Sequence, residues 1–127
     1  MTLFGIGIDV VEVERIGSSL SQFNGKFEER VFTQTEIDYC RSMKRPEIHF
    51  AARFAAKEAV SKALGTGIGK DVGWLDIEIV RAENGEPSIL LSGAAEEFAR
   101  RNEVGVIKIS LTHAEHYAAA NAVALGV

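Results

Sequence analysis

The first hydrophobic run of the chain predicts a β-strand. The stretch GIGIDVVEV is rich in β-branched residues such as Ile6, Ile8 and Val10, which favour strands. We expect a buried strand over about residues 3–11, ended by the charged stretch that follows it. Asp9 interrupts the hydrophobic run, so the pattern puts a carboxylate inside a strand near the start of the chain.

Helical signals occupy the next part of the chain. The apolar positions of residues 16–23 have helical spacing and predict a short helix after the strand. Thr33 lies three residues before Glu36, as in a capping box. A second helix is therefore expected over about residues 34–43.

The longest predicted helix begins at Pro46, because the first helical turn does not need the N–H that proline lacks, and ends before Gly65. Small apolar residues cover one of its faces and suit close packing. The chemically active residues lie on the other face in two stripes: Phe54, Glu58 and Lys62, and beside them Arg53, Lys57 and Ser61. Glu58 and Lys62 also have the spacing of an ordinary exposed ion pair, which contributes only about 0.3–0.5 kcal/mol.

A glycine-rich stretch, residues 65–73, follows without the strand and the Lys-Ser or Lys-Thr that a nucleotide-binding loop requires. Three further elements are predicted: a hairpin with a strand over residues 74–82, an Asn84-Gly85 turn and a strand from Pro87, a helix from Ser92 or Gly93, and a hairpin over about residues 104–125. This order predicts an α+β fold, a single small domain over residues 1–127 with a mainly antiparallel sheet and a long central helix.

The composition is that of an ordinary globular domain, since 46% of the residues are hydrophobic and 25% are charged. No apolar run approaches the roughly 20 residues that cross a bilayer, and no basic segment precedes the first strand, so we expect neither a membrane protein nor a secretory signal. The single cysteine, Cys40, excludes an intrachain disulfide and favours the reducing cytoplasm, with Cys40 in the core. A net charge of −4 argues against nucleic-acid binding.

One basic cluster departs from this acidic balance. Residues 41–45, RSMKR, carry three cations, and Arg53 and Lys57 follow soon after. The cluster is either a surface for phosphates or an acidic partner, or a solvated turn.

Asp9 and Glu58 suggest a metal site, because a buried carboxylate is costly unless it is paired, hydrogen-bonded or bound to a cation. If the two side chains converge, their oxygens suit Mg²⁺, which takes one or two carboxylates and completes its shell with water and substrate phosphate. Lys62, one helical turn beyond Glu58, would then neutralise phosphate charge. The alternative is that Asp9 caps a backbone group at the end of the strand or faces solvent.

Five segments carry a family resemblance: GIGIDVVEVERI, FEERVFTQTEIDYC, AARFAAKEAVSKALGTG, NGEPSILLSG and ISLTHAEHYAAANAVA. In this order, and over nearly the whole chain, they resemble the holo-[acyl-carrier-protein] synthases, the small bacterial type of 4′-phosphopantetheinyl transferase. The resemblance implies the fold of that family and transfer of 4′-phosphopantetheine from coenzyme A to a serine of apo acyl carrier protein, releasing adenosine 3′,5′-bisphosphate. It also implies a homotrimer with active sites between neighbouring subunits.

The resemblance implies roles for individual residues as well. Asp9 and Glu58 match the Mg²⁺ ligands and, with Lys62, the catalytic residues. The implied contacts of coenzyme A are Arg45, Arg53, Phe54, Ser61, Lys62, Gly65, Pro87 and His113. The implied carrier-protein surface is basic and includes Arg15, Lys26, Arg30 and Lys44, with glutamates among them.

The nucleophile of such a reaction belongs to the carrier protein, so this chain needs no catalytic serine, and either Glu58 or a metal-bound water serves as general base. Two other functions would use the same residues: a Mg²⁺-dependent pyrophosphohydrolase, with water as the nucleophile, and a non-catalytic trimeric ligand-binding module. We expect no zinc site at His113 and His116, because a third ligand is lacking. A neighbouring subunit is expected to cover the last hairpin.

Overall fold

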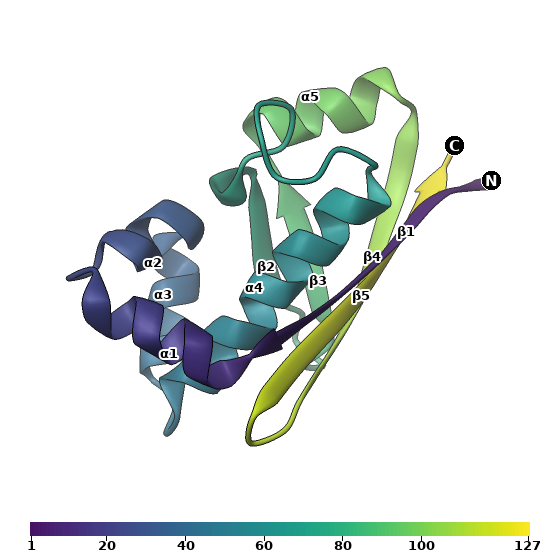
Figure 1. Cartoon of the computed structure of the whole chain (residues 1–127). Helices are drawn as coiled ribbons and strands as arrows, with labels where there is room; N and C mark the ends of the chain where they lie inside the picture. The colour runs from purple at the N-terminus through teal and green to yellow at the C-terminus, as the bar shows by residue number, and fades with distance from the viewer.

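The computed structural model describes residues 1–127 (Figure 1). The strands are β1 (Thr2–Glu12), β2 (Ile77–Arg81), β3 (Pro87–Leu91), β4 (Val104–His113) and β5 (Tyr117–Gly126). The helices are α1 (Val13–Gln22), α2 (Lys26–Val31), α3 (Gln34–Arg41), α4 (Pro46–Ala63), the short 3₁₀-helix η1 (Trp74–Asp76) and α5 (Gly93–Arg101). No helix combines the length and the apolar character that crossing a bilayer requires.

Two antiparallel sheets organise the chain. The three-stranded sheet has the order β1-β5-β4, so β1 lies at its edge and pairs only with β5. The β2–β3 hairpin forms a separate two-stranded sheet. The predicted α+β fold with antiparallel pairing is confirmed, with its strands divided between two sheets.

The long helix α4 packs along the inner face of the three-stranded sheet (Figure 1). The core at this contact contains alanines from both elements: Ala55, Ala56, Ala59 and Ala63 of α4, and Ala120, Ala122 and Ala124 of β5. Because these side chains are small, the helix and the strands approach closely. The helix is therefore the central element that the sequence predicts.

The strand β1 corrects the prediction of a buried strand. Ile6, Ile8 and Val10 point away from α4 and are 68%, 65% and 58% exposed, whereas Val11 packs against the core. The alternate positions Gly5, Gly7 and Asp9 face α4, since side chains alternate between the two faces of a strand. Asp9 therefore points toward the central helix, and the apolar face of the strand lies on the surface.

The predicted helix ends are largely confirmed. The capping box of α3 is present, with Thr33 N donating to Glu36 Oε1 at 2.8 Å and Glu36 N donating to Thr33 Oγ1 at 3.3 Å. The helix α4 begins at Pro46 as predicted. The sequence pattern misses α2, and residues 74–76 form η1 rather than the start of a strand, because an Asp76 carboxylate oxygen caps this turn.

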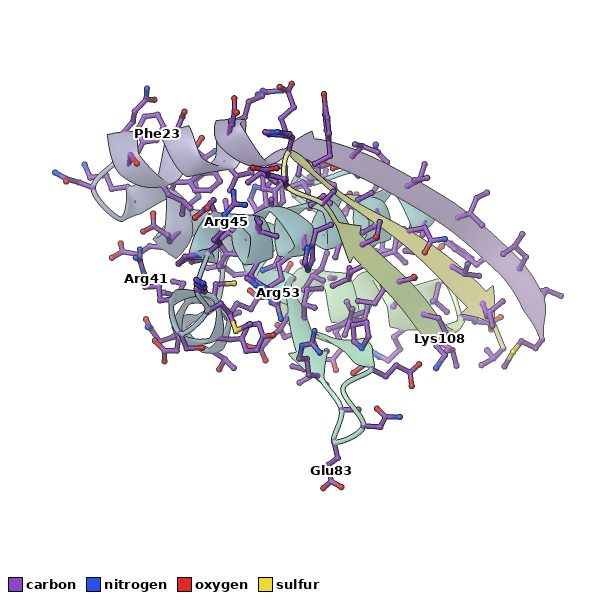
Figure 2. All side chains as sticks on the ribbon, turned by 90° about the horizontal axis from the view of Figure 1, so that it is seen from below. Phe23, Arg41, Arg45, Arg53, Glu83 and Lys108 are labelled. Atoms are coloured by element: carbon purple, nitrogen blue, oxygen red, sulfur yellow. The ribbon has the colours of Figure 1, made fainter.

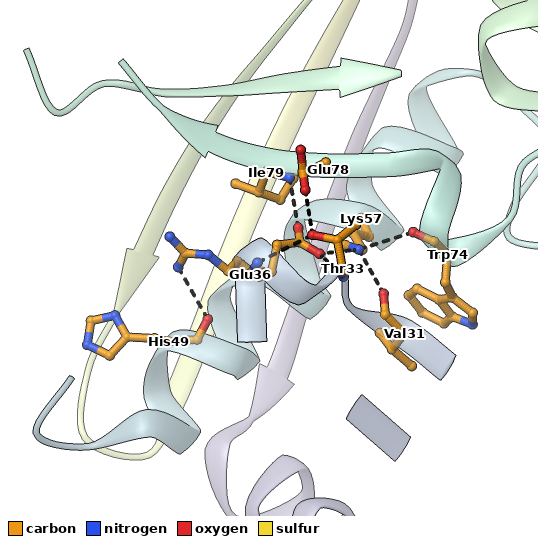
Figure 3. Close-up of polar contacts among 9 residues, drawn as sticks. Val31, Thr33, Glu36, His49, Lys57, Trp74, Glu78 and Ile79 are labelled. Carbon is orange, nitrogen blue, oxygen red and sulfur yellow. Dashed lines mark hydrogen bonds and ion pairs between the residues drawn. The ribbon is translucent and has the colours of Figure 1, made fainter. Parts of the chain in front are cut away.

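The second predicted stripe of α4 is buried, which corrects the expectation of one chemical face on this helix. The ammonium group of Lys57 is fully buried and donates to Glu36 Oε1 at 2.7 Å, to the Val31 carbonyl at 2.7 Å and to the Trp74 carbonyl at 3.1 Å (Figure 3). Burial lowers the pKa of Lys57, and the adjacent Glu36 carboxylate counteracts this. Lys57 is therefore not available to bind a phosphate.

Glu36 completes this buried network. Its Oε1 also accepts the Thr33 N–H, and its Oε2 accepts the Ile79 N–H at 2.7 Å (Figure 3). Each hydrogen of the Lys57 ammonium group thus has an acceptor, and both oxygens of Glu36 have donors. The network ties α3, α4 and β2 together at the centre of the molecule.

Candidate active site

Asp9 and Lys62 meet where β1 lies on α4. Lys62 Nζ donates to Asp9 Oδ1 at 3.3 Å and to the Ile8 carbonyl at 3.0 Å. The second oxygen, Asp9 Oδ2, is buried and has no hydrogen-bond partner. With its side chain only 17% exposed, Asp9 does not simply face solvent.

Glu58 lies one helical turn before Lys62 and is half-buried. Burial raises the pKa of the Glu58 carboxyl above its usual 4.5, the negative charge of Asp9 raises it further, and Lys62 partly offsets both effects. Two carboxylates and one ammonium group therefore share one site, as the spacing on the long helix predicts.

The cost of the Glu58 charge, which arises first from burial and then from the charge of Asp9, predicts that removing this charge stabilises the fold at neutral pH. The folded pKa lies above the unfolded one, so ionising Glu58 costs free energy in the folded chain at high pH and nothing where both states are protonated. We expect Glu58→Gln to raise the melting temperature at about pH 7 and to leave it unchanged at about pH 3. Thermal unfolding followed by circular dichroism checks this, and an equal shift at both pH values would contradict it.

The donor set of this site fits a divalent cation such as Mg²⁺. Carboxylate oxygens are the ligands that this ion prefers, and Asp9 Oδ2 is a buried oxygen that no protein donor satisfies. No group of three or more His, Cys, Asp or Glu side chains is arranged to hold a metal on its own. Asp9 and Glu58 would therefore leave several coordination positions to water and a substrate oxygen.

A pocket of about 290 Å³ lies between the end of β1, the start of β5 and the helices α1, α2 and α4, and Val10, the neighbour of Asp9 in the chain, is part of its lining. Phe54, one turn before Glu58, lines it and stacks against Phe27 and Trp74, with ring centroids 6.3 and 4.9 Å away. Arg15 is the single basic residue of its lining. The pocket thus offers an aromatic wall and one cation beside the acidic pair.

A second group of basic and aromatic residues surrounds the first half of α4. Arg53 is 4% exposed, its guanidinium lies 4.2 Å from the centre of the Tyr39 ring, and its buried Nε has no partner (Figure 2). The His49 ring lies 5.4 Å from the His113 ring, and Arg81 approaches the Tyr39 ring as well. Burial, and then the charges of His113 and the two arginines, lower the pKa of His49. This concentration of positive charge and N–H donors suits an anion.

The predicted site residues therefore fall into two groups within one chain. Arg53 and Glu58 are five residues apart on α4, so their directions differ by about 140° around the helix axis. Asp9 and Lys62 belong with Glu58, whereas His113 belongs with Arg53. One chain does not bring the acidic pair and the basic group to the same point.

The remaining predicted residues take up varied positions. Ser61 is buried and its Oγ donates to the Glu58 carbonyl at 2.7 Å. Arg45 pairs with Glu47 at 3.0 Å. Gly65 follows α4 with a φ of 83°, and Pro87 begins β3. The proposed carrier-binding cations are all exposed: Arg15, Lys26, Arg30 and Lys44.

The sequence pattern does not point to three of the residues that surround Arg53: His49, Tyr39 and Arg81. His49 stands one helical turn before Arg53, a spacing that is visible in the sequence. Tyr39 and Arg81 come from α3 and from the end of β2, and their approach to Arg53 depends on the packing of α3 and the hairpin around α4. No local pattern indicates that approach.

Comparison with known proteins gives the class of this enzyme. Residues 5–122 match the family model of the 4′-phosphopantetheinyl transferase superfamily. The antiparallel sheets and the central helix are therefore those of a phosphopantetheinyl transferase.

Individual relatives narrow this class. The holo-[acyl-carrier-protein] synthase of Protochlamydia amoebophila is 45% identical over 123 residues, which cover 97% of this chain and 98% of the relative. The solved structure of the Neisseria meningitidis synthase matches with a TM-score of 0.91 at 31% identity, over 97% of this chain and 98% of that one. The Helicobacter pylori synthase, solved in complex with coenzyme A, matches with a TM-score of 0.84 at 35% identity, over 94% and 98%. The chain belongs to the holo-[acyl-carrier-protein] synthase family, as its sequence motifs predict.

Proposed function

We propose that this enzyme transfers 4′-phosphopantetheine from coenzyme A to a serine of apo acyl carrier protein, with Mg²⁺ as cofactor. The observation that carries the proposal is the convergence of Asp9, Glu58 and Lys62 at the contact of β1 with α4. The coenzyme A complex of the Helicobacter pylori relative supports the choice of donor.

In the proposed reaction the serine oxygen bonds to the β-phosphorus of coenzyme A, and the bond from that phosphorus to the bridging oxygen breaks. Adenosine 3′,5′-bisphosphate leaves with this oxygen, and the serine proton must go to a base. Either the Glu58 carboxylate or a water held by the metal is suited to accept it. The Lys62 ammonium group adds a fixed positive charge for the phosphate oxygens. When bound by Asp9 and Glu58, Mg²⁺ would supply further charge stabilisation to the pyrophosphate.

The basic group around Arg53 is proposed to hold a phosphate of coenzyme A remote from the bond that breaks. The buried Nε of Arg53, which has no partner, and the nearby His113 supply donors for such an anion. Because this group and Asp9 point in different directions from one chain, we place a complete site between two subunits. Arg45, Arg53 and His113 of one subunit would then meet Asp9, Glu58 and Lys62 of its neighbour.

A homotrimer is the assembly that we propose, with the exposed apolar face of β1 in its interface. Three large apolar side chains lie exposed along the outer face of that strand: Ile6, Ile8 and Val10. We expect Ile8→Asp to give monomers in sedimentation and at least about a tenfold loss of transfer activity, because a charge in an apolar interface is costly. Leu90→Asp, at a position of β3 that is 57% exposed, is the matched control and should leave both the oligomeric state and the activity unchanged. A fully active monomer would contradict the shared site.

The carrier protein is proposed to dock on α1 and α2. Arg15 lies at the pocket beside the acidic pair, and Lys26 and Arg30 extend the positive charge along α2. An acidic carrier protein suits these cations, although Glu12 shares the pocket lining and makes the surface mixed.

The buried Cys40, whose pKa is raised to about 12 mainly by burial, is inert as a nucleophile and fits a cytoplasmic protein.

Intact-mass spectrometry tests the proposed function directly. Apo acyl carrier protein is incubated with the enzyme, coenzyme A and Mg²⁺, and we expect a mass gain of one phosphopantetheine that EDTA prevents. Breakdown of coenzyme A without carrier protein would favour the pyrophosphohydrolase instead. Binding of both substrates with no turnover would favour the non-catalytic module.

A further inference from the structure

Gly7 occupies a position with no room for a side chain. A Cβ atom there would lie 2.0 Å from the Ala59 carbonyl oxygen and 2.8 Å from the Ala63 backbone nitrogen. Both contacts are to backbone atoms, which cannot turn aside as the end of a flexible side chain does. Its φ is not in the left-handed region, so the requirement for glycine arises from the closeness of α4 and not from backbone conformation.

We propose that Gly7 is a positioning residue for the acidic pair: by letting the β1 backbone lie directly on the α4 backbone, it sets the separation of Asp9 from Glu58 and Lys62. The inference deepens the proposed function, on which it rests for the role of these groups. Asp9 is two residues from Gly7 on the same face of the strand, and Glu58 and Lys62 flank Ala59 on α4.

The expected displacement follows from the contact distances. Real Cβ contacts are at least 3.0 Å, so a methyl group that would stand at 2.0 Å requires a shift of about 1 Å. Because β1 is the edge strand of its sheet and pairs only with β5, it has more freedom to shift than the central helix α4. Asp9 moves with it, and its contact with Lys62, now 3.3 Å, lengthens. A misplacement of about 1 Å in a catalytic arrangement can reduce a rate about 10²-fold.

Gly5 provides a matched comparison on the same strand. A Cβ there would lie 2.1 Å from the Ala63 carbonyl oxygen, so the steric conflict is as severe as at Gly7. Gly5, however, is four residues from Asp9 and adjoins the register irregularity between Leu3 and Gly5. A shift at Gly5 is therefore absorbed at the end of the strand, whereas a shift at Gly7 reaches Asp9.

The experiment compares the full-length enzyme with Gly5→Ala and Gly7→Ala. The melting temperature should fall by a similar amount in both variants. We expect only Gly7→Ala to bind Mn²⁺ at least about tenfold more weakly, as measured by electron paramagnetic resonance without substrates, and to lose about 10²-fold in kcat with little change in the KM for carrier protein. Crystal structures of the variants give the separation of Asp9 Oδ1 from Lys62 Nζ directly.

A length-compensating variant separates positioning from general damage. Asp9→Glu adds one methylene and is expected to impair the enzyme in the wild-type background. In the Gly7→Ala background the longer side chain spans the widened gap, so we expect it to recover part of the Mn²⁺ affinity and of kcat. Should Gly7→Ala not fold, Ala59→Ser adds one atom to the residue whose backbone carbonyl lies against Gly7, and this variant is tested with the same readouts.

Several results would overturn the proposal. They are an unchanged separation of Asp9 from Lys62 in Gly7→Ala, equal losses of Mn²⁺ affinity and kcat in the two glycine variants, or no recovery of either quantity by Asp9→Glu. A wild-type enzyme that neither binds Mn²⁺ nor transfers phosphopantetheine would contradict the proposed function instead. The structural comparison of the two variants would still decide whether Gly7 sets the position of Asp9.

Discussion

We expect Asp9→Ala and Glu58→Ala each to reduce the rate of phosphopantetheine transfer by at least about 10³-fold, while the fold survives. Each change removes a carboxylate from the site at which the pyrophosphate charge must be neutralised. Stability changes little, because the Asp9–Lys62 pair is partly exposed and weak, and losing either carboxylate relieves their mutual repulsion. The measurements are the initial rate by intact-mass spectrometry and the melting temperature.

The matched control for these two variants is Glu83→Ala. Glu83 is an exposed carboxylate at the turn of the β2–β3 hairpin, which projects from the rest of the molecule (Figure 2). It should keep the wild-type rate and melting temperature. Near wild-type turnover in both Asp9→Ala and Glu58→Ala would contradict the assignment of these two residues.

The largest effect on stability is expected at the buried pair of Lys57 and Glu36. Lys57→Ala leaves the Glu36 carboxylate buried beside only neutral N–H donors, and Glu36→Ala leaves a buried ammonium group without its counter-charge. Breaking such a pair from one side costs about 3–5 kcal/mol. Urea denaturation of each single variant measures this loss as a lower unfolding midpoint.

A double variant distinguishes the net contribution of the ion pair to stability from the cost of leaving one of its charges buried alone. Lys57→Met with Glu36→Leu removes both charges and keeps most of the volume, so it should cost clearly less than the sum of the single changes. Lys108→Ala serves as the control, because Lys108 pairs with Glu86 at 3.5 Å on the surface and its loss should cost less than about 1 kcal/mol. Additive losses in the buried double variant would show that the two groups do not act as a pair.

The acidic pair is the part of the site that the sequence predicts best. Glu58 and Lys62 lie on a long helix with clear start and stop signals, and helical spacing alone puts them on one stripe. Asp9 stands out because a carboxylate is unusual within a hydrophobic strand. Local rules and the resemblance to a family point to the same three residues.

The prediction that β1 is buried is wrong for a physical reason. Hydrophobicity favours turning Ile6 and Ile8 toward the core, but the face next to α4 has no room for them. The glycines at alternate positions are the signal of close backbone contact, and a period of two leaves either face possible. The burial of Lys57 was equally out of reach, because its partner Glu36 is brought to it by the packing of α3 on α4.

The stack of Trp74 on Phe54 gives the enzyme its own optical probe. Trp74 is the single tryptophan of the chain, it is half-buried, and its ring lies 4.9 Å from a phenylalanine that lines the pocket beside Arg15. We expect a molecule that enters this pocket to exclude solvent from the phenylalanine and thereby to change the polarity around the neighbouring indole. The intrinsic fluorescence of the unlabelled enzyme therefore reports occupancy of the pocket, and a titration can follow docking separately from chemistry.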